Sequence, residues 1–304
     1  THRREKVTVE TIYDCIIIGA GPGGLQASIY LGRFNRKVLL IDRTGGRTAH
    51  AKSIENFLTH KAISGQELIA AGLEQAKGFH VEALRGLVVK VAKSDLFEVE
   101  TQEGGRFRGR FVIVSSGVVD NYPPIENLHQ YLGRNLFTCV DCDGYHTTGK
   151  KLLVIGNSIN SVRLAFAMRQ MFTKDIALNL IHYDPPPDVK EELTAEGIPL
   201  IKGTPVRVIG GERPEAVELK DGTRIPCEAI MCNFGYKLND PFLAGLSLKK
   251  VANGFKYVVN GYYESSMSGL FIVGPLNTGN DQVVIAAGEG AVAAIEINKR
   301  LLEL

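Results

Sequence analysis

The chain has no tryptophan, four methionines and only five cysteines among its 304 residues. So few cysteines, and an odd number of them, exclude the dense disulfide framework of small secreted domains. An excess of charge is also missing, because 35 lysines and arginines balance 33 aspartates and glutamates to a net charge of +2. This balance gives no electrostatic reason to expect nucleic acid or an acidic membrane as a partner.

Long apolar runs are absent as well, since none approaches the ~20 residues that a helix needs to cross a bilayer. The basic stretch from Thr1 to Lys6 is not followed by the apolar core of a secretion signal. We therefore expect a cytoplasmic protein without membrane partners, in a compartment that keeps most thiols reduced. With 304 residues, of which 44% are apolar, the chain is long enough for two domains.

The clearest motif lies near the N-terminus, where the apolar run Cys15 to Ile18 leads into Gly19, Gly21 and Gly24. This GxGxxG spacing between a strand and a helix is typical of a dinucleotide-binding turn. Its glycines allow a tight turn, close approach to a pyrophosphate, and close packing of helix on strand. Asp42 ends the next apolar run and has the place of a carboxylate that accepts hydrogen bonds from both ribose hydroxyls.

A second strand, turn and helix of the same layout begins at "KKLLVIGNSINS". Gly156 matches the first glycine, but Ser158 and Ser161 stand at the second and third positions, and Asp184 ends the following run. The C-terminal segment then returns to a strand, a loop and a helix from about Gln282. We expect an α/β fold of two Rossmann-like, three-layer ββα domains, the second inserted in the first. The expected ranges are 1–117 plus 243–304 for the first domain and 118–242 for the second.

Cys139 and Cys142 stand two residues apart just before the second turn, in "FTCVDCDGYH". Such a pair can close a small disulfide ring, and one of its thiolates can be stabilised. Zinc is the alternative, but no second CxxC or histidine pair stands at metal-ligand spacing, and we expect no metal site. His146 follows closely enough to tune the pair, although a surface turn is the default expectation for it.

Together these features resemble the low-molecular-weight thioredoxin reductases, and the resemblance covers nearly the whole chain. It implies FAD in the first domain, a CxxC pair in the second, a thioredoxin-like or other disulfide partner, and a homodimer. In the active site it implies that Cys142 faces the flavin, Cys139 attacks the partner and Asp143 transfers the proton. "GGR" from Gly45, "IENF" from Ile54, "VSSG" and "GLFIVG" match the family's flavin-contacting segments. The implied FAD-binding residues are Gly19, Gly21, Pro22, Gly24, Asp42, Arg43, Gly46, Arg47, Asn56, Ser116, Gly117, Gly274, Gln282 and Val283.

The departures from the family are as informative as the matches. The family's second loop is glycine-rich and binds NADPH, whose 2′-phosphate is held by a histidine and two arginines. Here His182 is followed by Tyr183 and Asp184, so no arginine there can pair with an extra phosphate. Pro275 replaces an aspartate that bonds the flavin's ribityl chain, and Asn277 or Asp281 is a candidate substitute. The second nucleotide site would then comprise Gly156, Asn157, Ser158, Asn160, Ser161, Tyr183 and Asp184.

The chain therefore resembles the branch of this family that does not use NADPH. A carboxylate suits a free ribose diol, so a second FAD in the second domain is one reading, as in diflavin-linked disulfide oxidoreductases. An empty scaffold domain with ferredoxin as electron donor is another, and NADH is a third. A redox-sensing flavoprotein without turnover stays open as a different class of function.

Overall fold

The computed structural model describes residues 11–43 and 46–304, and within them the chain divides into two compact units. Unit 1 comprises Thr1–Ala51, Ile63–Val119 and Leu238–Leu304, and unit 2 comprises Lys52–Ala62 and Asp120–Lys237. The expected α/β class and the insertion of one Rossmann-like unit in the other are confirmed. The division differs from the expected ranges mainly at Lys52–Ala62, which groups with unit 2 although its flanks belong to unit 1.

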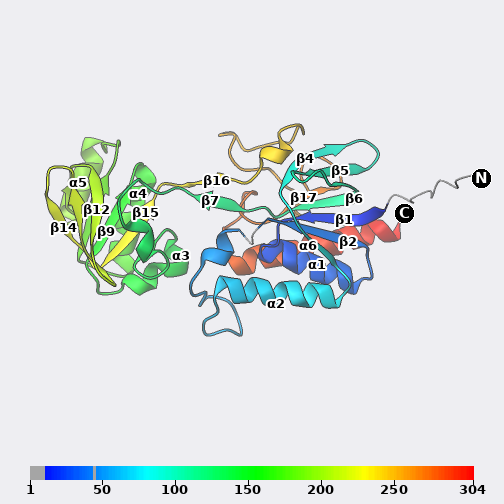
Figure 1. The fold of residues 1–304 in the computed structure, drawn as a ribbon. Helices are drawn as coiled ribbons and strands as arrows, with labels where there is room; N and C mark the ends of the chain where they lie inside the picture. Colours follow the sequence, from blue (N-terminus) through cyan, green and yellow to red (C-terminus); the bar gives the residue numbers. More distant parts are fainter. Residues whose placement is uncertain (1–10, 44–45) are drawn as a thin grey trace, which may run out of the picture. The chain divides into compact units, whose positions relative to one another are not determined.

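Unit 1 is built on a seven-stranded sheet in the order β3-β2-β1-β6-β5-β4, with β17 also paired to β6. Helices α1, α2 and α6 lie along one face of this sheet (Figure 1). The strands are β1 (Ile12–Ile18), β2 (Val38–Asp42), β3 (Glu82–Arg85), β4 (Val88–Lys93), β5 (Phe97–Thr101), β6 (Arg106–Val114) and β17 (Leu270–Ile272). The helices are α1 (Pro22–Arg33), α2 (Gly65–Gly78) and α6 (Val283–Leu302), with 3₁₀ turns η1 (Arg47–His50) and η4 (Pro241–Leu243).

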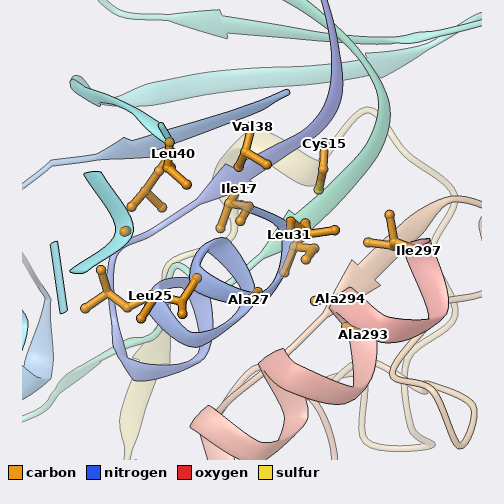
Figure 2. Packing of buried hydrophobic residues seen from close by; sticks show 14 of the residues in the cluster. Cys15, Ile17, Leu25, Ala27, Leu31, Val38, Leu40, Ala293, Ala294 and Ile297 are labelled. Atoms are coloured by element: carbon orange, nitrogen blue, oxygen red, sulfur yellow. The ribbon is translucent and has the colours of Figure 1, made fainter. Parts of the chain in front are cut away.

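The apolar run of β1 is buried on both faces, as expected of a central parallel strand. Cys15 and Ile17 point to the helices and pack with Leu31 and Ile297 (Figure 2), whereas Ile16 packs in the cluster on the opposite face. Burying a side chain such as Ile17 contributes about 1.5–3 kcal/mol relative to exposure. The strand thus joins both core layers of unit 1.

Unit 2 repeats the arrangement with a parallel sheet in the order β11-β10-β9-β15-β8 and a separate antiparallel sheet, β12-β13-β14. The parallel strands are β8 (Leu136–Phe137), β9 (Leu152–Gly156), β10 (Ile176–Leu180), β11 (Leu200–Ile201) and β15 (Ala229–Asn233). The antiparallel strands are β12 (Pro205–Gly210), β13 (Pro214–Leu219) and β14 (Arg224–Pro226). The helices are α3 (Val140–Asp143), α4 (Ile159–Met171) and α5 (Pro187–Ala195), with 3₁₀ turns η2 (Leu128–Tyr131) and η3 (Gly144–Thr147). The chain passes between the units at β7 (Val118–Asp120) and β16 (Tyr236–Leu238), which pair with each other.

Strand β10 ends at Leu180, four residues earlier than the apolar run had indicated. His182 adopts a left-handed conformation with φ of +57°, which turns the chain out of the sheet before Asp184. The prolines that follow, Pro185 to Pro187, lead into α5 rather than prolonging the strand. Asp184 therefore lies on the loop after β10 rather than in it.

Two helices of unit 1 make close backbone contacts at glycine residues. A Cβ atom at Gly24 would lie 1.9 Å from the carbonyl oxygen of Gly19, and one at Gly290 would lie 2.0 Å from the carbonyl oxygen of Gly23. Helix α6 thus touches the first turn of α1 backbone to backbone, and a side chain at either glycine would force the elements apart.

This contact leads to a first prediction, on stability. Gly290→Ala should lower the free energy of unfolding by about 1–3 kcal/mol, as overpacking of a rigid contact does. Gly288→Ala is the matched control, because nothing lies within 4 Å of its Cβ position on the same helix. It should be neutral or stabilise by up to about 1 kcal/mol. Urea unfolding followed by circular dichroism measures both, and equal midpoints for the two variants would contradict the contact.

Candidate functional site

In the glycine turn of unit 1, between β1 and α1, the backbone packs so closely that Gly19 and Gly24 have no room for a side chain. Gly19 has φ of +104°, and a Cβ there would lie 2.3 Å from the carbonyl oxygen of Ser115. Gly21 is the N-cap of α1, and Pro22 is its first residue. The Ser115 hydroxyl accepts a hydrogen bond from the Gly24 amide at 2.9 Å, so a side chain from β6's end fixes the turn.

Asp42 ends β2 and lies against this turn, because its Oδ1 accepts a hydrogen bond from the Ala20 amide at 2.9 Å. Arg43 follows it on the surface. Gly46, with φ of +60°, precedes Arg47, the first residue of η1. Gly45, the first residue of the "GGR" segment, lies outside the described residues.

The C-terminal segment contributes a second turn, held by a buried carboxylate that the motif comparison did not select. Glu289 of α6 is 3% exposed, and its Oε2 accepts hydrogen bonds from the Gly274 amide at 2.5 Å and from Asn277 Nδ2 at 2.8 Å. Burial raises the pKa of this carboxyl. The sequence signal was available: an acid within the apolar stretch "AAGEGAVAA" of a helix.

Neither candidate substitute for the family's ribityl-binding aspartate projects freely from this turn. Asn277 is buried and its amide is used inside the turn, by Ile272 O, Glu289 and the Gly279 amide. Asp281 pairs with Lys256 Nζ at 2.9 Å. The contacts thus assign both residues to holding the loop, with Pro275 beside Gly274 at its start.

The other residues that the family resemblance implies for flavin binding lie on three segments of the chain. Ser116 and Gly117 follow β6, where Ser116 Oγ donates to the Asn239 carbonyl at 2.6 Å and Gly117 has φ of +68°. Gln282 is the N-cap of α6 and Val283 its first residue. Asn56 is exposed on the Lys52–Ala62 segment, which groups with unit 2.

In unit 2, Cys139 and Cys142 form a disulfide across the first turn of α3, with Cα atoms 5.3 Å apart. Cys139 is the N-cap, and the Cys142 amide donates to its Sγ at 3.2 Å. An N–H directed at this sulfur would stabilise a Cys139 thiolate once the disulfide is reduced. Both cysteines and Asp143 are half-buried, and the Asp143 amide donates to the Cys139 carbonyl at 3.1 Å.

The remaining cysteines are of a different kind. Cys15, Cys227 and Cys232 are free and buried, and burial raises the pKa of Cys227 and of Cys232 to about 12. Burial also raises the pKa of Cys15, which lies in the core of unit 1. These thiols stay protonated at neutral pH and pack as small apolar groups.

The second turn keeps its tightness with serine in place of the third glycine. Ser161 is fully buried, and its hydroxyl lies 3.2 Å from both the backbone and side-chain oxygens of Asn233. A Cβ at Gly156 would lie 1.9 Å from Ser161 Oγ, so these two positions fit one another. Ser158 is the N-cap of α4, whereas Asn157 and Asn160 are exposed.

Asp184 forms an ion pair with a lysine of the helix that follows it. Lys190 of α5 donates from Nζ to Asp184 Oδ2 at 2.6 Å, and this bond lowers the pKa of the exposed carboxyl, with a further contribution from Lys202. Tyr183 packs against the unit 2 core. Two lysines that come later in the chain, Lys190 and Lys202, thus act on the Asp184 carboxylate.

Within residues 11–43 and 46–304, no three histidine, cysteine, aspartate or glutamate side chains gather to hold a metal ion. None of the helices described is long and apolar enough to cross a bilayer.

Two Rossmann-like units and a CxxC disulfide define a flavin-dependent disulfide oxidoreductase of the thioredoxin reductase type. Comparison with known proteins gives the family: residues 13–290 match pyridine nucleotide-disulphide oxidoreductases, and the chain belongs to that family. It is similar to a thioredoxin reductase of Aquifex aeolicus (strain VF5), with 30% identity over 96% of this chain and 94% of that protein. Thioredoxin reductase of Bacillus subtilis (strain 168) is 27% identical over 97% of this chain and 96% of its own length. The crystal structure of HlmI superposes with a TM-score of 0.90 at 29% identity, over 96% of this chain and 93% of that one.

The cysteine environments lead to a second prediction, on alkylation. After reduction with dithiothreitol and desalting, iodoacetamide at pH 8 should label Cys139 and Cys142 in the native protein and leave the three buried thiols unlabelled. In urea all five cysteines of the chain should react. Mass spectrometry of peptides gives the readout, with unreduced native protein as the control that should take no label. Rapid native labelling of Cys227 or Cys232 would show that burial does not protect them.

Proposed function

We propose that this protein passes electrons from FAD in unit 1 to the Cys139–Cys142 disulfide, and from the reduced pair to a thioredoxin-like or other disulfide partner, without NADPH. The observation that carries the proposal is the disulfide on a rigid helical turn, with an N–H directed at Cys139. FAD, when bound, supplies reversible two-electron chemistry that a disulfide can accept. From the likeness to thioredoxin reductases we also propose that the protein is a homodimer and cytoplasmic.

The contacts within unit 1 are compatible with bound FAD. The cradle at Gly19 and Gly24 leaves no room for a side chain, which suits the approach of a pyrophosphate to the start of α1. Asp42 lies beside that turn and provides an acceptor for ribose hydroxyls. The turn at Gly274 is held open by Glu289 from α6. The FAD-binding roles of these residues are our assignment.

The roles of the active-site residues follow the same reasoning. Cys139 is the exchanging sulfur, because a backbone N–H favours its thiolate. Cys142 is then the sulfur that faces the flavin, and Asp143, half-buried beside it, transfers a proton on that side.

For unit 2 we propose a second, unphosphorylated dinucleotide, most simply a second FAD. Gly156 and Ser161 keep the turn tight, and Asp184 at the loop after β10 suits a ribose diol. The alternatives are NADH or an empty scaffold with ferredoxin as the electron donor. The Asp184 carboxylate would repel a 2′-phosphate, and its bond from Lys190 moderates that repulsion.

The cofactor count gives a third prediction. The purified protein should be yellow and release FAD on denaturation, and a second FAD per chain would assign the site at Gly156 and Asp184. Asp184→Arg should then weaken the second flavin and leave the first in place, while Asp42→Ala should do the reverse. Extracted flavin per chain, measured by absorbance and chromatography, decides the count. A colourless protein that takes up no added FAD would overturn the proposed function.

NADPH use is the fourth prediction. Two charge-assisted hydrogen bonds to the 2′-phosphate, each worth roughly 1.5–3 kcal/mol, are missing from the stretch after β10. NADPH should therefore bind at least ~100-fold more weakly than an arginine-bearing site would allow, since ~1.4 kcal/mol is tenfold. Anaerobic mixing with micromolar NADPH should leave the flavin absorbance unbleached over seconds. Bleaching within a second would contradict the proposal, and its loss in Lys190→Gln would then identify the lysine as the phosphate's partner.

A further inference from the structure

Unit 1 contains a cavity of about 460 Å³ on the C-terminal part of the chain, close to the turn at Gly274. Its walls come from residues of the segment 259–263, from the loop 277–280 and from the first two turns of α6. None of the described residues that we assign to FAD or to the redox pair lines it. The volume falls in the range of roughly 300–1,000 Å³ that is typical of small-molecule sites.

The cavity has an exposed rim and a buried floor. Asn260 and Thr278 are exposed at the rim, and Tyr263 is half-buried. Asn277 and Glu289, which also line the cavity, are 1% and 3% exposed. A ligand that enters from solvent would therefore pass polar groups and meet a single buried acid at the floor.

The two carboxylate oxygens of Glu289 have different surroundings. Oε2 accepts hydrogen bonds from the Gly274 amide at 2.5 Å and from Asn277 Nδ2 at 2.8 Å. No hydrogen bond within residues 11–43 and 46–304 reaches Oε1. A Cβ at Gly279 would lie 2.8 Å from Oε1, and Gly279 itself lines the cavity. The missing side chain at position 279 thus leaves this oxygen uncovered.

The charges around the cavity favour a cation inside it. Among the described residues that line it, Glu289 is the acid and none is a lysine, arginine or histidine. Lys256, whose charge also acts on Glu289, donates to Asp281 Oδ1 at 2.9 Å and to the Gly279 carbonyl at 3.2 Å. Burial and the charge of Glu289 raise the pKa of Tyr263, so its phenol stays neutral at neutral pH. A bound anion would be repelled by Glu289, whereas a cation would be attracted to it.

We propose that this cavity binds a small organic cation, a primary amine on an apolar body, whose ammonium group donates to Glu289 Oε1. A single uncovered oxygen suits the compact ammonium group better than a guanidinium, whose planar fork pairs with both oxygens of a carboxylate. Val259 and Ile285 line the same cavity and offer contacts for the apolar body. The site is separate from the proposed electron transfer, and the inference does not rest on that function.

The probe is benzylamine, with benzyl alcohol as its neutral analogue, and the protein is the full chain as purified. Isothermal titration calorimetry should show saturable binding of benzylamine with a Kd of about 1 mM or tighter, as for a small ligand of good fit. Benzyl alcohol should bind at least about tenfold more weakly, because it lacks the charge that pairs with the carboxylate. Benzylamine should also raise the Tm, since it binds the folded state.

Two pairs of variants locate the site. Glu289→Gln keeps an acceptor oxygen for the Gly274 amide and puts an uncharged amide in place of the carboxylate, so benzylamine should bind at least about tenfold more weakly. Its control is Glu296→Gln on the same helix, because Glu296 pairs with Arg300 and does not line the cavity. Binding by this control should stay within about twofold of wild type.

Gly279→Ala is the second test and leaves α6 unchanged, so it applies even if Glu289→Gln fails to fold. Its methyl group would cover Glu289 Oε1 and should weaken benzylamine, whereas Gly288→Ala, with nothing within 4 Å of its Cβ position, should not. Absence of saturable benzylamine binding, equal affinity for benzyl alcohol, or unchanged affinity in folded Gly279→Ala would overturn the proposal. Neither electron transfer nor cysteine exchange enters these measurements, so their failure would leave the proposed function standing.

Discussion

The structure of unit 1 depends on the close approach of backbone to backbone at the start of α1. Gly24 lies on Gly19, Gly19 on Ser115, and Gly290 of α6 on Gly23, so strand, first helix and last helix meet where no side chain fits. Because α6 comes from the C-terminal end of the chain, this contact joins the two ends of the sequence in one unit and leaves the middle as an insertion. The same packing keeps side chains away from the start of α1, where we propose that a pyrophosphate binds, so stability and the proposed binding share one constraint.

Unit 2 shows how the same layout accommodates a serine at a position that the motif gives to glycine. Ser161 replaces a glycine without opening the turn, because its hydroxyl reaches Asn233 and its side chain fills the space above Gly156. The redox pair lies on a segment whose rigidity comes from other contacts, through Gly144, Thr147 and Phe172. The contacts that fix the disulfide segment are therefore separate from those that close the turn at Gly156 and Ser161.

Much of this was predictable from sequence, because glycine spacing and apolar runs are local signals. The turn at Gly19, the end of β2 at Asp42, the start of α6 and the CxxC disulfide all agree with expectation. Sequence singles out Glu289 as an acid within an apolar helix, but it could not supply contacts between distant elements, such as Glu289 with the Gly274 turn or Lys190 with Asp184. The end of β10 was wrong by four residues because the left-handed turn at His182 carries no sequence signal of its own.

The central claim is that flavin and disulfide are two connected electron acceptors in one chain. An anaerobic titration with dithionite, counted per chain, tests it most directly. Wild-type protein should take up two electrons more than the Cys139→Ser/Cys142→Ser double variant, whether one flavin or two is bound, because the disulfide accepts two electrons. Equal uptake by the two proteins, with the flavin fully reduced in both, would show that the pair does not exchange electrons with the flavin.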